Sequence, residues 1–263
     1  MARSSFYYNL RKLREKDKYE EEKAKISDIF GQKKGIYGYR RVYFEMRNKQ
    51  GYKLNRKTIQ RLMQEMGLKS KIRVKKYNSY KRGNESLVAP NILNRQFETS
   101  KPNEKWVTDI TEFKLFGQKL YLSPILDLFN GEIVSYAIKN SLAFDLVLET
   151  VKKALEKKNK EDTLLLHSDQ GWHYRMENYQ RLLKENQIIQ SMSRKGNCFD
   201  NAVMENFFGH LKSELFYLKN FNSVEHFISE LEEYIDFWNN RRVRVILNGL
   251  SPIQYRTQLQ SVA

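Results

Sequence analysis

An alternation of short β-rich runs with longer helical runs, beginning at residue 105, limits the fold of this chain more than any other feature. Three runs rich in β-branched and aromatic residues come first, and later runs switch between strand-like and helix-like spacing. In chain order the segments are 105–113, 118–128 and 131–138 (strands), 142–157 (helix), 163–169 (strand), 175–186 (helix), 187–192 (strand), 200–216 (helix) and 223–239 (helix). This order predicts an α/β domain, a five-stranded mixed sheet with helices packed on it.

The first part of the chain has a helical pattern instead. Apolar positions predict helices near residues 1–30 and 39–50 and a third helix over 56–66, which Asn55 caps and Gly67 ends. Two helices joined by a short glycine-containing turn fit a helix-turn-helix, a pattern that many helical hairpins share. The third helix has a polar side that we predict to be exposed, formed by Arg56, Lys57, Gln60 and Arg61.

The positive charge of the chain is concentrated in the same region. The net charge is +16, and residues 1–100 hold 26 Lys and Arg against 10 Asp and Glu, whereas residues 101–263 hold 21 of each. Such an asymmetry predicts a module that binds a polyanion, joined to a neutral globular domain; a solvated basic surface without a partner is the simpler alternative. We therefore expect a helical module over 1–68, a basic linker over 69–100 and the α/β domain over 101–263.

Composition argues against a membrane or secreted protein. No run of about 18 apolar residues occurs, and the N-terminal segment has no apolar stretch of the kind that signal peptides contain. Cys198 is the one cysteine, so it has no partner for an internal disulfide or a zinc cluster. We expect a cytoplasmic, reduced protein without a membrane segment.

Three acidic residues stand in positions where an ionised carboxylate needs compensation. Asp109 lies in a predicted strand on the same face as Val107 and Phe113, because side chains alternate along a strand. Asp169 ends the apolar run 163–169, at the carboxyl end of a strand, where open α/β sheets place their ligands. Glu205 borders the apolar stripe of the helix 200–216. A structural ion pair or cap is the default explanation for each acid alone, whereas the three together suggest a catalytic site.

Divalent metal ions would supply the missing positive charge. Mg²⁺ prefers oxygen ligands, and two such ions about 4 Å apart activate an attacking oxygen and stabilise a leaving oxygen in phosphoryl transfer. The four histidines have no zinc-like spacing. Lys212 lies seven residues after Glu205, which places it about 20° from Glu205 around a helix and roughly 10 Å along it. A cation there would hold a DNA phosphate beside the metals, although a solvated helix lysine is the simpler alternative.

At these residues the sequence resembles a known family. The stretches "WVTDITEF", "HSDQGWHY" and "SMSRKGNCFDNAVMENFFGHLKSELF" resemble the DDE transposases encoded by the second reading frame (OrfB) of bacterial insertion sequences, members of the retroviral integrase superfamily with an RNase H-like fold. The resemblance covers nearly the whole chain, and "GIYGYRRVYFEM" and "LNRKTIQRLMQEMGLKSKIRVKK" are similar to the family's helix-turn-helix region.

The resemblance implies a role for each acid and a reaction. Asp109, Asp169 and Glu205 match the family's catalytic, metal-binding triad, and Lys212 matches a basic residue associated with terminal DNA contact. The implied cofactor is Mg²⁺ or Mn²⁺, as two ions. In this fold the strands that carry Asp109 and Asp169 are neighbours. We interpret Asp200, in the family's Asp-Asn-Ala tripeptide, as the N-cap of the catalytic helix.

The resemblance also implies partners. These are DNA, as terminal inverted repeats and as target, the product of an upstream frame (OrfA), separate or fused, and further copies of the chain on DNA. The expected activity is nicking and strand transfer at the ends of an insertion sequence by a protein associated with the bacterial nucleoid. Two alternatives remain: a non-catalytic DNA-binding regulator, when the upstream-frame partner is lacking, and a general RNase H-like nuclease.

Overall fold

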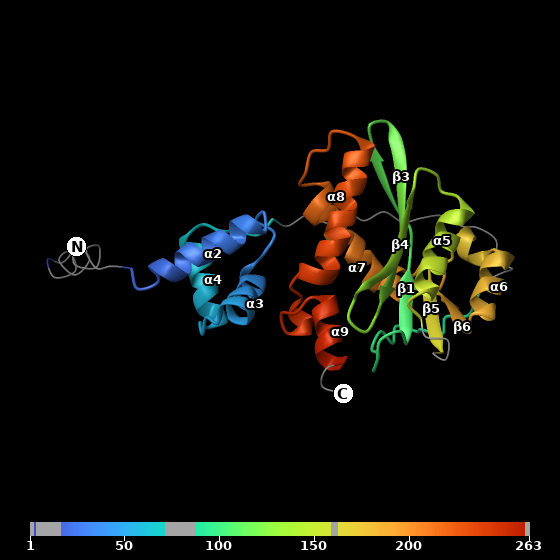
Figure 1. Cartoon of the computed structure of the whole chain (residues 1–263), viewed down its shortest axis with the longest axis horizontal. Coiled ribbons are helices and arrows are strands. Elements are labelled where there is room, and N and C mark those ends of the chain that lie inside the picture. The colour runs from blue at the N-terminus through green and yellow to red at the C-terminus, as the bar shows by residue number, and fades with distance from the viewer. Residues whose placement is uncertain (1–2, 4–16, 72–87, 159–162, 261–263) are drawn as a thin grey trace. The chain divides into compact units, whose positions relative to one another are not determined.

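A computed structural model of the chain describes residue 3 and residues 17–71, 88–158 and 163–260 (Figure 1). Two compact units emerge, residues 1–72 and 73–263. Half of the predicted helix near residues 1–30 and residues 72–87 of the predicted basic linker lie outside the described residues. Among the helices that the structure describes, none combines the length and the apolar character that a membrane span requires.

The first unit contains three helices: α2 (Glu20–Gln32), α3 (Tyr39–Gln50) and α4 (Arg56–Glu65). The Asn55 side chain accepts a hydrogen bond from the backbone N–H of Lys57 at 2.9 Å, so the predicted cap of the third helix is confirmed. Gly67 has a φ of +68° just beyond this helix, a conformation that glycine adopts at little cost. The core of the unit is formed by buried apolar residues from all three helices: Ile26, Ile29, Val42, Met46, Ile59, Leu62 and Met63.

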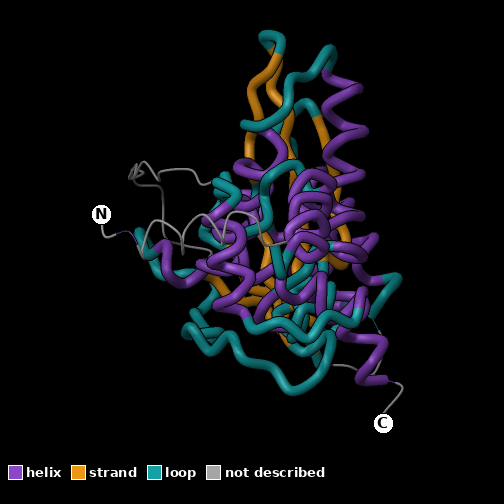
Figure 2. The backbone as a smooth tube through the Cα atoms, turned by 90° about the vertical axis from the view of Figure 1, so that its left-hand side faces the viewer, coloured by secondary structure: helices purple, strands orange, loops and turns teal. Residues whose placement is uncertain are grey.

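The second unit is a twisted mixed sheet between two layers of helices (Figures 1 and 2). Its strands are β1 (Lys105–Thr108), β2 (Thr111–Leu115), β3 (Gln118–Asp127), β4 (Ile133–Lys139), β5 (Leu164–Ser168) and β6 (Ile188–Met192). Strands β1 and β5 pair in parallel, as do β5 and β6, whereas the other pairs are antiparallel. The predicted α/β class and mixed sheet are confirmed.

One predicted strand, residues 105–113, is divided into β1 and β2 at Asp109 and Ile110. Both parts lie along β3 in a continuous register, because Thr108 pairs with Ile125 and Thr111 with Leu122. The sheet therefore keeps the five positions that the sequence predicts, with a break in one of them. At this break the Asp109 carboxylate accepts the N–H of Ile110 at 2.7 Å, so the side chain satisfies a backbone donor beside the ladder.

Helices cover both faces of the sheet (Figure 1). α5 (Phe144–Leu155) and α6 (Glu177–Glu185) bury their apolar sides in a core that includes Trp106, whereas α7 (Ala202–Leu211) and α8 (Val224–Asp236) pack on the face that includes Val107. The alternation of Trp106 and Val107 between the two cores follows from the two-residue period of a strand. Short turns complete the unit: the 3₁₀ segments Trp172–Arg175, Cys198–Asn201 and Val245–Leu247, and the π-helical turns Lys212–Phe216 and Phe237–Arg241.

The last helix, α9 (Pro252–Gln260), was not among the helices that the periodicity predicts. Its start has a recognisable signal: the Ser251 hydroxyl accepts the N–H of Gln254 at 3.3 Å, while the Gln254 side chain accepts the N–H of Ser251 at 3.0 Å. This reciprocal arrangement is a capping box, followed by proline at the first helical position. The helix has little apolar periodicity, so the spacing of hydrophobic residues does not identify it.

Candidate active site

Asp109 and Asp169 come together because their strands are neighbours. In the parallel pair, Val107 of β1 lies opposite His167 of β5, and the two aspartates follow these strands at the same edge of the sheet. Asp109 is half-buried and Asp169 is exposed. The carboxyl ends of adjacent parallel strands are where α/β proteins place their ligands, so this edge is the candidate site.

The Asp169 carboxylate is held by the turn that follows it. Its Oδ1 accepts the backbone N–H of Gly171 at 2.8 Å. A Cβ atom on Gly171 would lie 2.9 Å from the same oxygen, so any larger residue would push the carboxylate away. The short distance explains why glycine stands two residues after the aspartate.

Helix α7 carries Glu205 and is tied to the end of β1. The Asn201 side chain, at the start of this helix, donates a hydrogen bond to the Thr108 carbonyl at 3.1 Å, immediately before Asp109. Met204 and Phe208 of the helix are buried against the sheet, as predicted, whereas Glu205, which the helical spacing places at the border of this apolar stripe, is exposed. The α-helix ends at Leu211, and Lys212 begins the π-helical turn with its Nζ 5.5 Å from the ring centroid of Phe113.

Negative charge accumulates at this edge. The pKa of Asp109 is raised well above its usual value, first by burial and then by the charge of Asp169, with Glu205 adding to the effect and Lys212 opposing it. Although the residue as a whole is exposed, nearby protein atoms exclude water from the Asp169 carboxylate and raise its pKa, while the Gly171 N–H and Arg175 oppose the shift. Asp169, Glu205 and Lys212 thus all lie within electrostatic reach of Asp109, and the neighbouring cations do not balance the acids.

Three carboxylates with excess negative charge fit a hard divalent cation such as Mg²⁺ in the chemistry of their donors. As the side chains stand, no three His, Cys, Asp or Glu residues in the described part of the chain are arranged to hold a metal ion. Binding would therefore require side-chain movements that bring the carboxylates closer. The assignment of Asp109, Asp169 and Glu205 as ligands stays a prediction.

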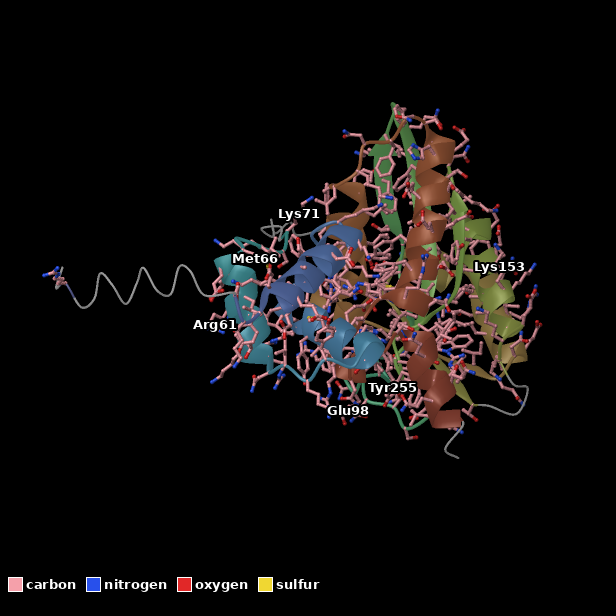
Figure 3. All side chains as sticks on the ribbon, turned by 60° about the vertical axis from the view of Figure 1, so that its left-hand side comes forward. Arg61, Met66, Lys71, Glu98, Lys153 and Tyr255 are labelled. Atoms are coloured by element: carbon pink, nitrogen blue, oxygen red, sulfur yellow. The ribbon has the colours of Figure 1, made fainter. Side chains whose placement is uncertain are left out.

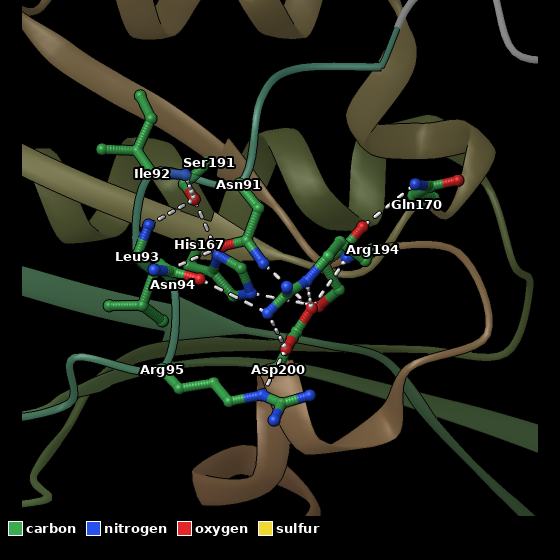
Figure 4. Close-up of polar contacts among 11 residues, drawn as sticks. Asn91, Ile92, Leu93, Asn94, Arg95, His167, Gln170, Ser191, Arg194 and Asp200 are labelled. Atoms are coloured by element: carbon green, nitrogen blue, oxygen red, sulfur yellow. Dashed lines mark hydrogen bonds and ion pairs between the residues drawn. The ribbon is translucent and has the colours of Figure 1, made fainter.

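Asp200 has a different role from the one expected. Its carboxylate accepts hydrogen bonds from the backbone N–H and guanidinium of Arg194, the guanidinium of Arg95 and the amide of Asn91, at 2.8–3.2 Å (Figure 4). The side-chain hydrogen bond of Arg194, before the other contacts, holds the pKa of Asp200 well below its usual range. The N-cap interpretation is wrong, because α7 begins at Ala202 after a 3₁₀ turn and the residue at its cap position, Asn201, makes no side-chain capping bond.

The segment 90–95, upstream of the sheet, forms part of the same cluster. The Ser191 hydroxyl accepts the N–H groups of Ile92 and Leu93 at 2.9 and 3.0 Å, and Leu93 is buried in the core beneath α7. His167 lies between the hydroxyls of Ser191 and Ser193, at 2.9 and 3.0 Å (Figure 4). Burial lowers the pKa of His167 to about 4. This network fixes the start of α7 relative to β5 and β6.

The predicted DNA-reading residues lie on α4 of the first unit. Arg56, Lys57 and Arg61 are exposed, and Gln60 is half-buried. Figure 3 labels Arg61 on this helix. Arg61 faces Glu65 at 3.8 Å and stacks over Tyr19 at 5.4 Å from its ring centroid, so contacts within the module use part of its charge. The role of Arg56, Lys57, Gln60 and Arg61 in DNA binding stays a prediction.

A cavity of about 480 Å³ lies in the same unit, lined by Tyr43, Arg47, Gly51, Tyr52, Lys53 and Leu54. Sequence reasoning did not identify these residues. Arg47 donates a hydrogen bond to the Tyr43 hydroxyl at 2.8 Å, which fixes a cation beside an aromatic ring. In the sequence, the signal for this cavity is the spacing of Tyr43 and Arg47, an aromatic residue and an arginine four positions apart on one helix.

Comparison with known proteins gives a consistent result. Residues 99–198 and 205–259 each match an integrase core domain, and residues 16–76 match an HTH-like domain. The chain is 50% identical over 258 residues to the putative transposase InsK for insertion sequence element IS150 of Escherichia coli (strain K12), an alignment that covers 98% of this chain and 90% of that protein. It is also 50% identical over 206 residues to an uncharacterized transposase-like protein of Haemophilus influenzae, covering 78% of this chain and 94% of that protein.

A solved structure shares the fold. A chain in the cryo-electron microscopy structure of the simian T-cell lymphotropic virus intasome in complex with PP2A regulatory subunit B56 gamma aligns with a TM-score of 0.50 at 19% identity. The alignment covers 60% of this chain and 57% of that chain. At this identity the similarity concerns the arrangement of the sheet and helices.

Proposed function

Because the chain belongs to the family of insertion-sequence transposases with an integrase core domain, we propose that it nicks DNA and transfers strands at the ends of its element, with Asp109, Asp169 and Glu205 as the catalytic acids. The observation that carries the proposal is the parallel pairing of β1 and β5, which sets two aspartates at one sheet edge within the electrostatic reach of a third acid. Proteins with an integrase core generally use divalent metal ions, and the three carboxylates are the residues that would hold Mg²⁺ or Mn²⁺ here.

The reaction is a pair of phosphodiester substitutions. In nicking, a water oxygen forms a bond to phosphorus as the bond to the 3′ oxygen breaks, and the water's proton passes to the leaving oxygen or to solvent. In strand transfer, the freed 3′ hydroxyl oxygen forms a bond to a target phosphorus as the bond to a target-strand 3′ oxygen breaks, and the hydroxyl proton passes to the leaving oxygen or to solvent. Two bound divalent ions would polarise the attacking oxygen and stabilise the leaving one.

The protein's own residues position the substrate for this chemistry. The Gly171 N–H holds one oxygen of Asp169, and Asn201 holds α7, with Glu205, to the end of β1. Lys212 contributes a cation beside the acids for a DNA phosphate. Such contacts accelerate the reaction by orientation and charge stabilisation.

The helical module contributes DNA binding, because it matches an HTH-like domain and lies in the basic part of the chain. We assign backbone binding to its exposed cations and base contacts to the face of Arg56, Lys57, Gln60 and Arg61. The upstream-frame product, and assembly of several copies on paired ends, are further proposals that rest on the family resemblance.

The test is a nicking and joining assay with labelled element ends and Mg²⁺. Asp169→Asn keeps the size of the side chain and removes its charge, so we expect a loss of product of roughly 100-fold or more with DNA binding retained. Asp236→Asn is the matched control, since Asp236 is an exposed acid of α8 that pairs with Arg241 at 2.8 Å; we expect wild-type activity from it.

The alternatives give other outcomes in the same assay. Binding of the ends without chemistry, both with and without the upstream-frame product, would indicate a DNA-binding regulator. Cutting of unrelated DNA at the same rate as element ends would indicate a general nuclease. Equal activity of Asp169→Asn and wild type would remove Asp169 from the active site.

A further inference from the structure

The cavity of the first unit lies where the chain turns from α3 into α4. Two residues of α3 and residues 51–54 of the turn line it. Gly51 ends α3 with a φ of +70°, and the Met46 carbonyl accepts the N–H groups of both Gly51 and Tyr52. The turn is therefore fixed by backbone hydrogen bonds, and it leads directly to Asn55, the cap of α4.

Two cations line this cavity, Arg47 and Lys53, and both side chains are exposed. Arg47 is held by Tyr43, because it donates to the hydroxyl at 2.8 Å and its guanidinium carbon lies 6.0 Å from the ring centroid. No acidic residue lines the cavity, and in the part of the chain that the structure describes neither cation forms an ion pair with a carboxylate. Both positive charges are therefore available to an external anion.

The walls of the cavity are two tyrosine rings that contacts outside it hold in place. Tyr43 packs edge-on against Phe44 with 5.2 Å between the centroids, and Tyr52 donates its hydroxyl to Glu21 of α2 at 3.0 Å. Both tyrosines are half-buried. The site is thus formed before a ligand arrives, which lowers the entropic cost of binding.

The chemistry of the lining favours a phosphodiester as the ligand. Guanidinium and ammonium groups form strong, charge-assisted hydrogen bonds to phosphate oxygens. Aromatic rings offer apolar surface to the sugar or base beside a phosphate. The volume of about 480 Å³ lies within the range of about 300–1,000 Å³ that sites for small organic ligands have, so a phosphate fits together with its sugar.

Tyr43 connects the cavity to the proposed base-contacting face of α4. Arg56 lies 6.0 Å from the centroid of the Tyr43 ring, so one ring contacts a cation of the cavity and a cation of that face. The lining residues also fall within the stretch 16–76 that matches an HTH-like domain. A DNA backbone that lies beside this face of α4 can therefore reach the cavity.

We propose that this cavity holds one phosphodiester group of DNA, with Arg47 and Lys53 contacting the phosphate oxygens and the rings of Tyr43 and Tyr52 against the adjoining sugar. The contact is non-covalent. It fixes the position of the backbone and, through it, the register of α4 on the bases. The inference rests on the proposed DNA binding by the helical module and adds a defined phosphate site to it.

The experiment measures binding of the full-length protein to a labelled duplex that carries one element end, by fluorescence anisotropy. In a set of such duplexes, a neutral methylphosphonate replaces one backbone phosphate at a time, which leaves the bases and the protein unchanged. We expect a position at which this replacement weakens wild-type binding about 10-fold, because hydrogen bonds to a charged group are lost.

Arg47→Gln and Lys53→Gln test the protein side of the same contact. Each variant should bind the unmodified duplex about 10-fold more weakly than the wild type. At the position identified, the methylphosphonate should then weaken the binding of either variant by about 2-fold at most, because groups that act through one contact are not additive.

Arg40→Gln is the matched control. Arg40 is an exposed arginine of α3 that also bonds a tyrosine hydroxyl, that of Tyr39 at 3.1 Å, but it does not line the cavity. This variant should keep the full wild-type loss at the position identified. If Arg40→Gln also removes that sensitivity, the attraction is diffuse and the inference is overturned.

The outcomes separate this site from DNA binding as such. If the wild type binds the duplex but no position couples to Arg47 and Lys53, the cavity site is overturned and the proposed DNA binding stands. Failure of the wild type to bind the duplex would overturn both. Displacement of the duplex by an equimolar amount of a free deoxynucleoside monophosphate would also overturn the inference, because the cavity would then be a site for a small nucleotide.

Discussion

At the scale of single residues, Asp169 and Asp200 show that identical side chains acquire opposite properties from their surroundings. The loss of solvent around its carboxylate raises the pKa of Asp169, whereas the hydrogen bonds from two guanidinium groups lower the pKa of Asp200. The first environment favours recruitment of an external cation, and the second already contains its counter-charges. The sequence already suggests a catalytic role for Asp169 and a structural one for Asp200, but the anchoring of Asp200 by guanidinium groups depends on neighbours distant in sequence, such as Arg95.

His167 gives a residue-scale prediction about pH. Its pKa in the folded protein is about 4, below the usual 6.5, so folding disfavours its protonation. Stability should therefore begin to fall as the pH drops below 6.5, and this contribution is fully lost near pH 4, for a total of about 3 kcal/mol. We expect His167→Gln to flatten this part of the curve in urea unfolding between pH 7 and pH 4.

The control for this measurement is His226→Gln. His226 is a half-buried residue of α8 whose ring lies 3.7 Å from Glu230, and its replacement shows how much of any change arises from removing a histidine as such. If wild type and His167→Gln lose stability in parallel over this range, carboxylates rather than His167 govern the acid sensitivity.

At the scale of elements, the positions where regular structure stops have the greatest consequence for the site. The break between β1 and β2 falls at Asp109, and the α-helical geometry of α7 gives way to a π-helical turn at Lys212. In that turn, Glu214 forms a buried pair with Arg242, at 2.7 Å, which anchors the turn to the C-terminal region. Such irregular turns occur frequently at functional sites. Periodicity locates the elements, but their interruptions depend on contacts with the rest of the sheet.

Helix α4 gives a prediction at this scale. Arg56→Gln together with Lys57→Gln should weaken binding to an inverted-repeat duplex, and each lost phosphate contact should reduce the slope of log affinity against log salt by about 1. Fluorescence anisotropy between 50 and 200 mM KCl measures both quantities. Lys25→Gln, on α2 of the same module, removes a cation that pairs with Asp28 at 3.6 Å and should have little effect. An equal loss with Lys25→Gln would indicate a diffuse attraction rather than a reading face.

At the scale of the whole molecule, the chain joins a basic N-terminal part to an α/β unit whose residues 101–263 carry no net charge. All of the net charge of +16 lies within the first hundred residues, while the candidate active site lies in the second unit. The matched integrase core begins at residue 99, but the second unit extends further upstream. Segment 90–95 contributes Leu93 to the hydrophobic core of this unit and two hydrogen-bond donors, Asn91 and Arg95, to the Asp200 carboxylate. This upstream segment should therefore belong to the folding unit.

Two fragments test this conclusion. We expect residues 88–263 to unfold cooperatively, and residues 99–263 to be less stable by about 2 kcal/mol or more, because the shorter fragment loses the buried Leu93 and leaves Asp200 with fewer hydrogen bonds. Urea unfolding of both fragments measures the difference. Equal midpoints and slopes would show that the 90–95 segment contributes nothing to the unit.

The amino-acid sequence alone predicts the order of helices and strands, apart from α9 and the break between β1 and β2, together with the cap of α4, the separation of charge and the three candidate acids. These features are local: spacing fixes which side chains share a face, and composition fixes charge. The pairing of β1 with β5 and the anchoring of Asp200 were decided by the tertiary structure. Each depends on burial and on charges brought from distant parts of the chain, and the strength of an electrostatic interaction is set by that environment.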